Sequence, residues 1–368
     1  KISAKLCRDI AKEIEDEISR TPVNKGTNRH LGVLKARIAR LREQERERIE
    51  RGKGQVGDGY TVRKDGDATV VLLGLPSVGK STLLNHLTNS NSKVGAYDFT
   101  TLTVIPGVLK YRGAQIQMLD IPGIIRGASE GKGLGKRILS TTRSADLLLV
   151  VVDVFNPKIR STLLEEIRNI GIRPDEQPPD IRIEKRGSGG IIITDLVGMT
   201  EMNEDGMKEI LREYRYHNSR VVVREDVDYD RFVDVLLKNT VYIPTLTVVN
   251  KIDMVDSEWI EKLEKEADYE FVAISADNDI NLELLKETVF EKLDLIRLYM
   301  SPKGEDPDFE EPLIIKKGST IEDVADKIHR ELKKDLRFTR VWGKSVKFGG
   351  QKVGLSHQPV DEDIITFY

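Results

Sequence analysis

The apolar and polar positions along the chain follow two periods, one typical of buried strands and one typical of amphipathic helices. Short apolar runs predict buried strands at 68–73, 115–119, 146–152, 242–249 and 269–274. Helical spacing of apolar residues predicts helices at 81–87, 158–169 and 282–295. Because the strands alternate with helices, we expect an α/β core with a mostly parallel sheet and helices on both faces.

Three further segments flank or interrupt this core. Residues 4–20 and 29–50 repeat isoleucine and leucine at helical spacing, which predicts an N-terminal helical hairpin. A small α+β insert is predicted by strand patterns at 181–185, 191–194 and 220–224 and helical patterns at 207–216 and 229–237. A C-terminal β-grasp module is predicted by strand patterns at 313–316, 338–342 and 364–367 and a helical pattern at 321–332.

These patterns divide the chain into domains. We expect an N-terminal helical hairpin at 1–51, a Gly-rich linker at 52–66, the α/β core at 67–171 and 241–296, the inserted α+β domain at 172–240, and the β-grasp domain at 297–368. A chain of 368 residues is long enough for two to four domains with cores of their own.

Composition narrows the cellular setting. The single cysteine, Cys7, precludes an intramolecular disulfide framework and favours the cytoplasm. The most apolar run, 147–152, is far too short to cross a bilayer, so we expect no membrane partner. The formal net charge is −3, so any affinity for nucleic acid must come from local basic patches.

A phosphate-binding loop joins the first predicted core strand to the helix after it. Residues 74–81 read Gly-Leu-Pro-Ser-Val-Gly-Lys-Ser, a complete G-x-x-x-x-G-K-[ST] motif. Its glycines let backbone N–H groups surround a triphosphate, Lys80 reaches the β- and γ-phosphates, and the Ser81 hydroxyl can ligate Mg²⁺. The phosphate contacts expected here are Gly74, Pro76, Ser77, Val78, Gly79, Lys80, Ser81 and Thr82.

A second motif identifies the base. Residues 250–253 read Asn-Lys-Ile-Asp and follow the apolar run 242–249, the place of the guanine-reading N-K-x-D loop of GTPases. The Asp253 carboxylate can accept from guanine N1–H and the 2-amino group together, a pair that adenine lacks. A site built on such hydrogen bonds rejects analogues without them, so GTP is preferred over ATP. The residues expected to line the base pocket are Asn250, Lys251, Asp253, Ser275 and Ala276.

Two segments between these motifs predict a nucleotide-dependent switch. Residues 120–123 form a D-x-x-G motif, in which Asp120 holds Mg²⁺ through water and the Gly123 N–H faces the γ-phosphate. Upstream, spacing favours Thr101 as a Mg²⁺ ligand, and the alternative is that Thr100 and Thr101 are an ordinary β-prone pair. The predicted Mg²⁺ ligands are Ser81, Thr101 and Asp120, the predicted catalytic residues are Lys80, Thr101 and Gly123, and Phe99 and Thr100 are further nucleotide contacts.

The catalytic machinery lacks one common part. Many regulatory GTPases orient the attacking water with a glutamine just after the D-x-x-G glycine, and Ile124 occupies that position. Because isoleucine neither donates nor accepts, we expect slow intrinsic hydrolysis, about 10⁻⁴ to 10⁻² s⁻¹. Assistance by a monovalent cation such as K⁺ stays open, since Ser77 replaces the asparagine often used for it.

The combined motifs resemble a known family. The segments GLPSVGKS, YDFTTLTVIPG and DIPGIIRGASEGKGLG resemble the Obg-related class of translation-factor GTPases. Residues 30–35 and 214–218 and the C-terminal tail narrow the resemblance to the developmentally regulated GTP-binding proteins, the DRG family. Residues 353–365 are similar to the TGS domain, a β-grasp fold. The resemblance implies a P-loop GTPase core and a cytoplasmic GTPase associated with the ribosome or RNA, and a regulatory protein partner stays open.

Three basic segments are candidate contacts for RNA. They are the second N-terminal helix with Arg29, Lys35, Arg37, Arg40, Arg42, Arg46 and Arg48, the insert with Arg212, Arg215, His217, Arg220 and Arg224, and the TGS domain with Lys333, Lys334, Arg337, Arg340, Lys344 and Lys347. For the helix, the alternative is a solvated hairpin that packs on its own GTPase domain. For the insert, the alternative is ion pairing with acidic neighbours such as Glu213 and Glu225.

The sequence therefore predicts a GTP-binding and slowly GTP-hydrolysing switch that acts in translation on the ribosome or RNA. Its expected ligands are GTP or GDP and Mg²⁺. The alternative is a nucleotide-gated RNA-binding or assembly scaffold, in which hydrolysis only resets the state.

Overall fold

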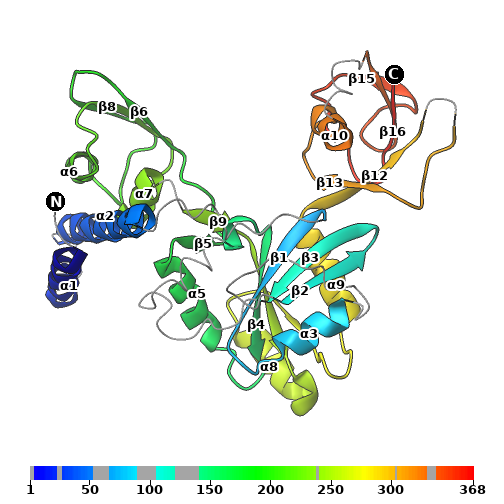
Figure 1. The fold of residues 1–368 in the computed structure, drawn as a ribbon, viewed down its shortest axis with the longest axis horizontal. Helices are drawn as coiled ribbons and strands as arrows, with labels where there is room; N and C mark the ends of the chain where they lie inside the picture. Colours follow the sequence, from blue (N-terminus) through cyan, green and yellow to red (C-terminus); the bar gives the residue numbers. More distant parts are fainter. Residues whose placement is uncertain are drawn as a thin grey trace. The chain divides into compact units, whose positions relative to one another are not determined.

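A computed structural model describes residues 4–22, 27–52, 66–88, 105–120, 141–237, 240–302, 305–329 and 337–368 (Figure 1). The chain forms two compact units. The first comprises residues 1–59 and 176–242, and the second comprises residues 60–175 and 243–368. The predicted N-terminal hairpin and the predicted insert thus belong to one unit, and the α/β core and the C-terminal domain belong to the other.

A six-stranded sheet forms the centre of the second unit, with the strand order β11-β10-β4-β1-β3-β2. Its strands are β1 (Ala68–Leu73), β2 (Ile105–Tyr111), β3 (Ala114–Asp120), β4 (Leu147–Asp153), β10 (Thr245–Asn250) and β11 (Phe271–Ala273). All neighbours run parallel except β2, which pairs antiparallel with β3. This confirms the predicted mostly parallel sheet.

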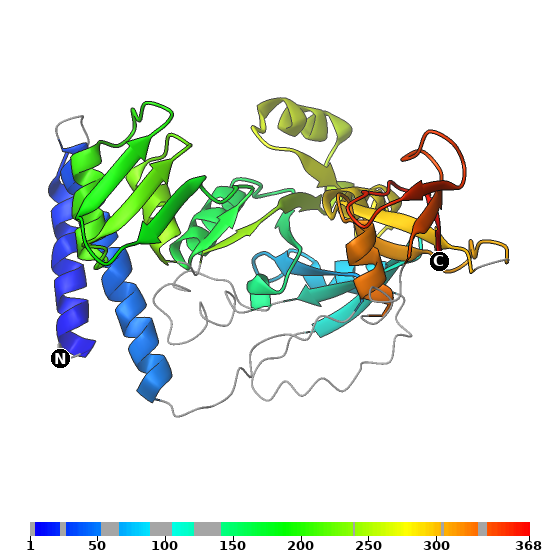
Figure 2. The ribbon, with the colours of Figure 1, turned by 90° about the horizontal axis from the view of Figure 1, so that it is seen from above.

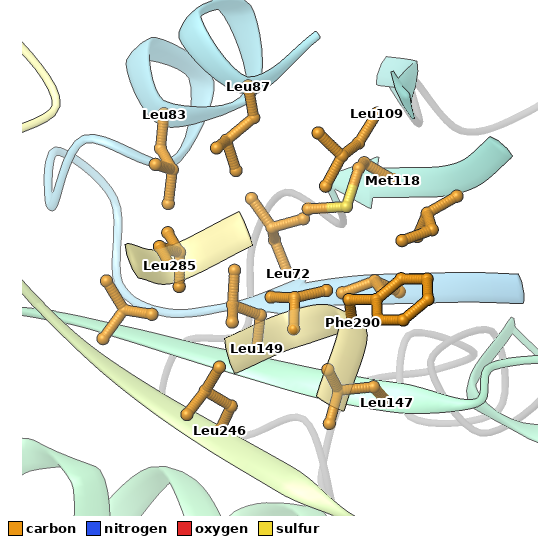
Figure 3. Close-up of a cluster of buried hydrophobic side chains, with 14 of the residues drawn as sticks. Leu72, Leu83, Leu87, Leu109, Met118, Leu147, Leu149, Leu246, Leu285 and Phe290 are labelled. Carbon is orange, nitrogen blue, oxygen red and sulfur yellow. The ribbon is translucent and has the colours of Figure 1, made fainter. Parts of the chain in front are cut away.

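Helices and one apolar cluster complete this domain. The helices are α3 (Lys80–Leu87), α5 (Ile159–Asn169), α8 (Ser257–Glu266) and α9 (Leu282–Lys292), with a 3-10 turn η1 (Ile252–Met254). Figure 3 shows how Leu83 of α3 and Leu285 of α9 pack with Leu72 and Leu149 of the sheet. Strands β1 and β4 are buried along their length except for the half-exposed Asp153, so near-continuous apolar runs are what both faces require.

Two predicted elements of the core differ in the structure. The strand expected at 242–249 is wrong as a single element, because it divides at Pro244 into β9 (Val241–Ile243) and β10. β9 pairs with β5 (Ile172–Pro174), whereas β10 enters the large sheet. Proline has no N–H to donate to a ladder, which explains the break at this position. The helix expected at 282–295 ends at Lys292, and Leu295 already begins the next strand.

The first unit contains a three-stranded sheet with the order β6-β8-β7. Its strands are β6 (Ile181–Lys185), β7 (Ile191–Asp195) and β8 (Ser219–Val223), and its helices are α6 (Glu204–Glu213) and α7 (Tyr229–Leu237). The helix α6 begins earlier than the expected range 207–216, because the Asn203 side chain accepts from the Gly206 N–H and caps it.

The N-terminal hairpin consists of α1 (Ala4–Arg20) and α2 (Asn28–Gly52). One side of α2 packs on α1 through Ile14, Leu34 and Ile38. Its other side places Ala36 in the core of the insert, and Figures 1 and 2 show α2 lying along α7. Within the first unit, the insert is therefore the surface on which α2 packs.

Ion pairs accompany this packing and involve four of the basic residues in α2. The shortest join Arg29 to Glu209 at 3.0 Å, Lys35 to Asp230 at 2.6 Å and Arg40 to Glu213 at 2.7 Å, and Arg37 lies 3.9 Å from Glu213. Four of the basic residues are therefore ion-paired within the unit, and an RNA contact of this helix stays a prediction. Their charges are compensated within the unit, because acidic residues of α6 and α7 face them.

The C-terminal domain is a five-stranded sheet with the order β13-β12-β16-β14-β15. Its strands are β12 (Leu295–Met300), β13 (Leu313–Lys316), β14 (Thr339–Trp342), β15 (Gln351–Val353) and β16 (Ile364–Phe367), and α10 (Ile321–Ile328) packs against it. A Thr320–Asp323 capping box starts α10. The expected helix extension to residue 332 lies partly outside the described residues.

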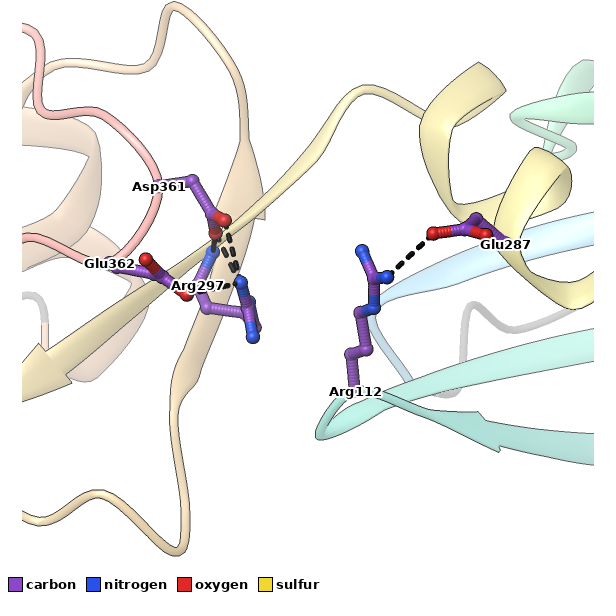
Figure 4. Close-up of polar contacts among 5 residues, drawn as sticks. All are labelled: Arg112, Glu287, Arg297, Asp361 and Glu362. Atoms are coloured by element: carbon purple, nitrogen blue, oxygen red, sulfur yellow. Dashed lines mark hydrogen bonds and ion pairs between the residues drawn. The ribbon is translucent and has the colours of Figure 1, made fainter.

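This domain and the α/β core share structure within the second unit. In β12, Leu295 belongs to the core cluster, and Ile296 and Leu298 belong to the C-terminal cluster. Figure 4 shows Arg297 of β12 bound to Asp361 and Glu362, with guanidinium distances of 2.7 and 2.9 Å. No helix among the described residues is both long and apolar enough to cross a membrane.

Gly32 provides a test of the α2–α7 packing. A Cβ at Gly32 would lie 2.2 Å from Cγ of Tyr229, a residue with only 5% exposure. We predict that Gly32→Ala lowers the free energy of unfolding by about 1–3 kcal/mol, the usual cost of overpacking, despite the gain in helix propensity. In the control Gly187→Ala, the new Cβ meets nothing within 4 Å. Urea denaturation of both variants checks this, and a Gly32→Ala protein more stable than wild type would contradict it.

Candidate functional site

The carboxyl ends of the parallel strands bring the predicted motifs to one edge of the sheet. Residues 74–81 follow β1, Asp120 ends β3, Asn250 ends β10, and Ser275 follows β11. In open α/β sheets, ligands bind at this edge because the loops there come from several neighbouring strands. The structure therefore gathers the four described motifs that were widely separated in the sequence.

Backbone geometry explains the glycines of the phosphate loop. Gly79 has a φ of 93°, and a Cβ there would lie 2.3 Å from Nδ2 of Asn250. A Cβ on Gly74 would lie 2.3 Å from the carbonyl oxygen of Val151. A side chain at either position would therefore clash, so the path of the loop requires glycine at both.

Lys80 begins α3 and points back into the loop. Its Nζ donates to the carbonyl oxygens of Gly74 at 3.1 Å and Leu75 at 2.8 Å. Burial lowers the pKa of the Lys80 ammonium from its usual value of 10.5, and the Asp120 carboxylate opposes this shift. Among the described residues, the hydrogen-bond acceptors of this buried cation are carbonyl oxygens, an arrangement that favours a phosphate beside it.

Ser81 and Asp120 lie together beside Lys80. The Ser81 hydroxyl donates to Oδ2 of Asp120 at 3.1 Å. Asp120 is 4% exposed, and its Oδ1 is buried without a hydrogen-bond partner among the described residues. A buried carboxylate oxygen without a donor is costly unless a cation or water satisfies it. A hydroxyl and a carboxylate are ligand types that Mg²⁺ prefers, so these two residues fit that ion.

The buried amide of Asn250 joins three loops. Its Nδ2 donates to the Val78 carbonyl at 2.9 Å, and its Oδ1 accepts from the Ala276 N–H at 3.0 Å. The neighbouring Lys251 has a φ of 68°, and its Nζ donates to the Ser77 carbonyl at 2.7 Å. The base-reading loop is therefore fixed to the phosphate loop by side chains of two adjacent residues.

The remaining base-pocket residues lie at the same edge. Asp253 lies in η1 and is exposed, whereas Ser275 and Ala276 are buried. The Ile252 N–H donates to the Ile274 carbonyl at 3.2 Å, which holds the Asp253 loop against the loop after β11. The Asp253 carboxylate thus faces solvent next to a wall of buried backbone.

Comparison with known proteins decides the family. Residues 69–185 match the family described as 50S ribosome-binding GTPase, residues 188–295 match the C-terminal region of that domain, and residues 296–368 match the TGS domain. The chain is 42% identical over 354 residues to Developmentally-regulated GTP-binding protein 2 of Homo sapiens, covering 96% of each chain.

The chain belongs to the developmentally regulated GTP-binding protein family.

Two other proteins are similar to this DRG chain. An uncharacterized GTP-binding protein of Methanocaldococcus jannaschii is 49% identical over 358 residues, which cover 96% of this chain and 91% of that protein. The solved YchF GTPase of Schizosaccharomyces pombe is 16% identical, with a TM-score of 0.48, and the match covers 83% of this chain and 99% of that one. The family resemblance expected from the motifs is confirmed, and the chain is a GTP-binding protein with a GTPase domain and a TGS domain.

Several predicted site residues of this DRG chain lie outside the described residues. They are Phe99, Thr100, Thr101 and Gly123, and Ile124 lies there too. The structure adds one contact that the motifs did not indicate, between Nδ1 of His86 and Oδ1 of Asp279 at 2.7 Å. It joins α3 to the loop after Ser275. No motif marks this pair, because it depends on the position of α3 relative to a loop far along the sequence.

The buried Lys80 ammonium predicts a pH dependence of stability. Because its pKa is lowered in the folded state, the unfolded state binds more protons between that lowered pKa and 10.5. The free energy of unfolding contributed by Lys80 therefore rises with pH across this window. Chemical denaturation of nucleotide-free wild type and Lys80→Met as a function of pH measures it. The free energy of unfolding of wild type should rise relative to that of Lys80→Met as the pH approaches 10.5. Parallel dependences of the two free energies on pH would contradict the prediction.

Proposed function

We propose that this chain is a slowly GTP-hydrolysing molecular switch that acts in translation, on the ribosome or RNA, in the cytoplasm. The observation that carries the switch is the convergence of Lys80, the Ser81–Asp120 pair and the Asn250 bridge at one edge of the sheet. This arrangement combines a phosphate cradle, a cation site and a base pocket. The matched family of GTP-binding proteins supports the choice of nucleotide.

The bound nucleotide would span the Asn250 bridge. Its phosphates would lie against the loop 74–81, where the Lys80 ammonium replaces its carbonyl contacts with the β- and γ-phosphate oxygens. Its guanine would lie between the Lys251 stem and the Ser275–Ala276 wall, with its N1–H and 2-amino group donating to Asp253. The residues given this role are those predicted from the sequence.

Ser81 and Asp120 would hold Mg²⁺, together with Thr101 from the segment outside the described residues. The ion would supply charge stabilisation for the transferred phosphoryl group. Lys80 and the backbone N–H of Gly123 would stabilise charge on the γ-phosphate oxygens. Loss of the γ-phosphate would release the segments around Thr101 and Gly123, which is the switch.

Hydrolysis would be slow without a partner. Ile124 has no group that could orient water, so the intrinsic rate is expected at about 10⁻⁴ to 10⁻² s⁻¹. The same residue favours the second candidate function, a nucleotide-gated RNA-binding or assembly scaffold that hydrolyses GTP only to reset. The two differ in turnover beside the partner, which rises for the switch and stays slow for the scaffold.

Basic surfaces and the description of the matched family support the ribosome or RNA as partner. One family is described as ribosome-binding, and that description concerns the family. In the insert, Arg182, Arg220 and Arg224 line a hollow of about 210 Å³ on the sheet face. Two of these arginines also pair locally, Arg182 with Glu184 at 2.9 Å and Arg224 with Asp180 at 3.6 Å. Glu184 also lines the hollow and is the register partner of Arg220. A regulatory protein is a further candidate partner.

The base-pocket role of Asp253 is tested by a change of nucleotide. In Asp253→Asn, the amide can accept and donate, so it suits xanthine, which has a carbonyl where guanine has its 2-amino group. We predict that GTP affinity falls on the order of 10- to 100-fold, since hydrogen bonds to charged groups contribute about 1.5–3 kcal/mol, and that binding of xanthosine triphosphate rises. Fluorescent-nucleotide titration measures both.

The matched control for this test is Asp256→Asn. Asp256 precedes α8 and its side chain makes no cap hydrogen bond. Its loss should leave both affinities unchanged. An Asp253→Asn protein that keeps full GTP preference would show that this carboxylate does not read the base.

The ribosome role is tested by co-sedimentation in three states: with GDP, with a non-hydrolysable GTP analogue, and without nucleotide. A GTP-gated ribosome factor pellets with ribosomes selectively in the analogue state. Equal pelleting in all three states would contradict gating. No pelleting in any state would reject the ribosome as the partner and leave free RNA or a protein.

A further inference from the structure

One face of the TGS sheet carries aromatic rings and cations together. In β14, Thr339 and Val341 are buried, and Val341 belongs to the cluster that includes α10. Because side chains alternate along a strand, Phe338 and Arg340 lie on the opposite face. The register pairs Arg340 with Lys352 of β15 and Thr339 with Phe367 of β16. This places Lys352 and Tyr368 on the same outer face as Phe338.

These four residues, Phe338, Arg340, Lys352 and Tyr368, form a compact group that we call the basic aromatic cluster. The rings of Phe338 and Tyr368 stack with centroids 4.9 Å apart and an interplanar angle of 10°. The Lys352 Nζ lies 3.7 Å from the Phe338 centroid, and the Arg340 Cζ lies 5.3 Å from the Tyr368 centroid. Both cations are exposed and both rings are half-buried. The cluster is thus a surface stack of two parallel rings with a cation over each.

The sequence segment that carries most of the cluster is basic. Residues 337–353 contain no aspartate or glutamate, and their charged residues are Arg337, Arg340, Lys344, Lys347 and Lys352. The whole chain has a formal net charge of −3, so this segment is a local exception. Such a patch attracts a polyanion.

The combination selects one class of polyanion. Unpaired nucleobases stack on aromatic side chains, each contributing about 1–3 kcal/mol, while lysine and arginine contact the phosphates. A duplex keeps its bases stacked inside and offers only its backbone. An acidic peptide would use the cations and leave the parallel rings without a role. We propose that the basic aromatic cluster binds unpaired nucleotides of RNA. This deepens the proposed function by assigning an RNA class to one surface of the TGS domain.

The same domain contains an aromatic pair with the opposite electrostatic setting. Tyr299 and Phe309 lie with ring centroids 5.0 Å apart, and Phe309 is 60% exposed. The acidic neighbours of Phe309 in the sequence are Glu305, Asp306, Asp308, Glu310 and Glu311. Both aromatic pairs therefore offer ring surface for stacking. Among the described residues, only the Phe338–Tyr368 pair has Lys352 and Arg340 over its rings. Phe309 is accordingly a matched control for Phe338.

The experiment measures fluorescence anisotropy of a labelled oligouridine of about 12 nucleotides, within the footprint of roughly 4–16 nucleotides known for similar surfaces. The full chain is compared with Phe338→Leu, Phe309→Leu and the double variant Arg340→Gln/Lys352→Gln. Leucine keeps an apolar side chain and removes the ring. Thermal unfolding of each variant confirms that it is folded.

We expect Phe338→Leu to weaken oligouridine binding by about 5- to 100-fold, which corresponds to the stacking of one base. Its affinity for an RNA duplex of equal length should not change. The Arg340→Gln/Lys352→Gln protein should bind more weakly and with a smaller dependence on salt. Phe309→Leu should bind like wild type.

Several results would overturn the proposal. They are wild-type protein that does not bind oligouridine, equal losses for Phe338→Leu and Phe309→Leu, and equal losses for single strand and duplex. Displacement of oligouridine by polyglutamate at equal charge concentration would instead favour an acidic protein partner. Ribosome co-sedimentation of the same variants distinguishes a failure of this inference from a failure of the proposed function. Cluster variants that pellet normally with the GTP analogue while wild type fails to bind oligouridine would reject this inference and retain the proposed function.

Discussion

The buried side chain of Asn250 holds the nucleotide edge of the GTPase domain together. One amide satisfies the Val78 carbonyl in the phosphate loop and the Ala276 N–H in the base-pocket wall. Leaving either buried group unpaired would cost about 1–3 kcal/mol, so the bridge fixes the spacing between phosphate and base contacts. Gly79 follows from the same constraint, since a Cβ there would meet the amide nitrogen. The positions of Lys80, Lys251 and Asp253 all depend on this arrangement.

The strand that ends at Asp120 also connects the nucleotide edge with the TGS domain. The turn between β2 and β3 lies at the other end of this strand, and a Cβ on Gly113 would lie 2.4 Å from Pro312. Beside it, Arg112 pairs with Glu287 of α9 at 2.6 Å (Figure 4). Lys316 of the TGS domain pairs with Asp146 at 2.7 Å. The TGS domain thus contacts the turn of the β-hairpin whose far end carries a proposed Mg²⁺ ligand.

The sequence predicted the parts that local rules determine. Buried strands such as β1 read as continuous apolar runs, and the phosphate and base motifs placed Lys80 and Asn250 at one edge because parallel strands end together. The sequence pattern did not predict which elements pack against one another. The apolar stripe of α2 predicted a buried face but not its partner, and only the structure shows Gly32 against Tyr229 and basic residues paired with acidic residues of the insert. The break at Pro244 was visible in the sequence and was outweighed by the apolar residues around it.

The central claim is that GTP hydrolysis by this chain is a switch controlled by the ribosome or RNA. Single-turnover GTP hydrolysis measured with and without saturating ribosomes tests it most directly. The account predicts slow hydrolysis by the free protein, about 10⁻⁴ to 10⁻² s⁻¹, and acceleration of at least about tenfold with ribosomes, because a partner must supply what Ile124 lacks. Ribosomes that bind the GTP-loaded protein and leave its rate unchanged would contradict the switch and favour the scaffold.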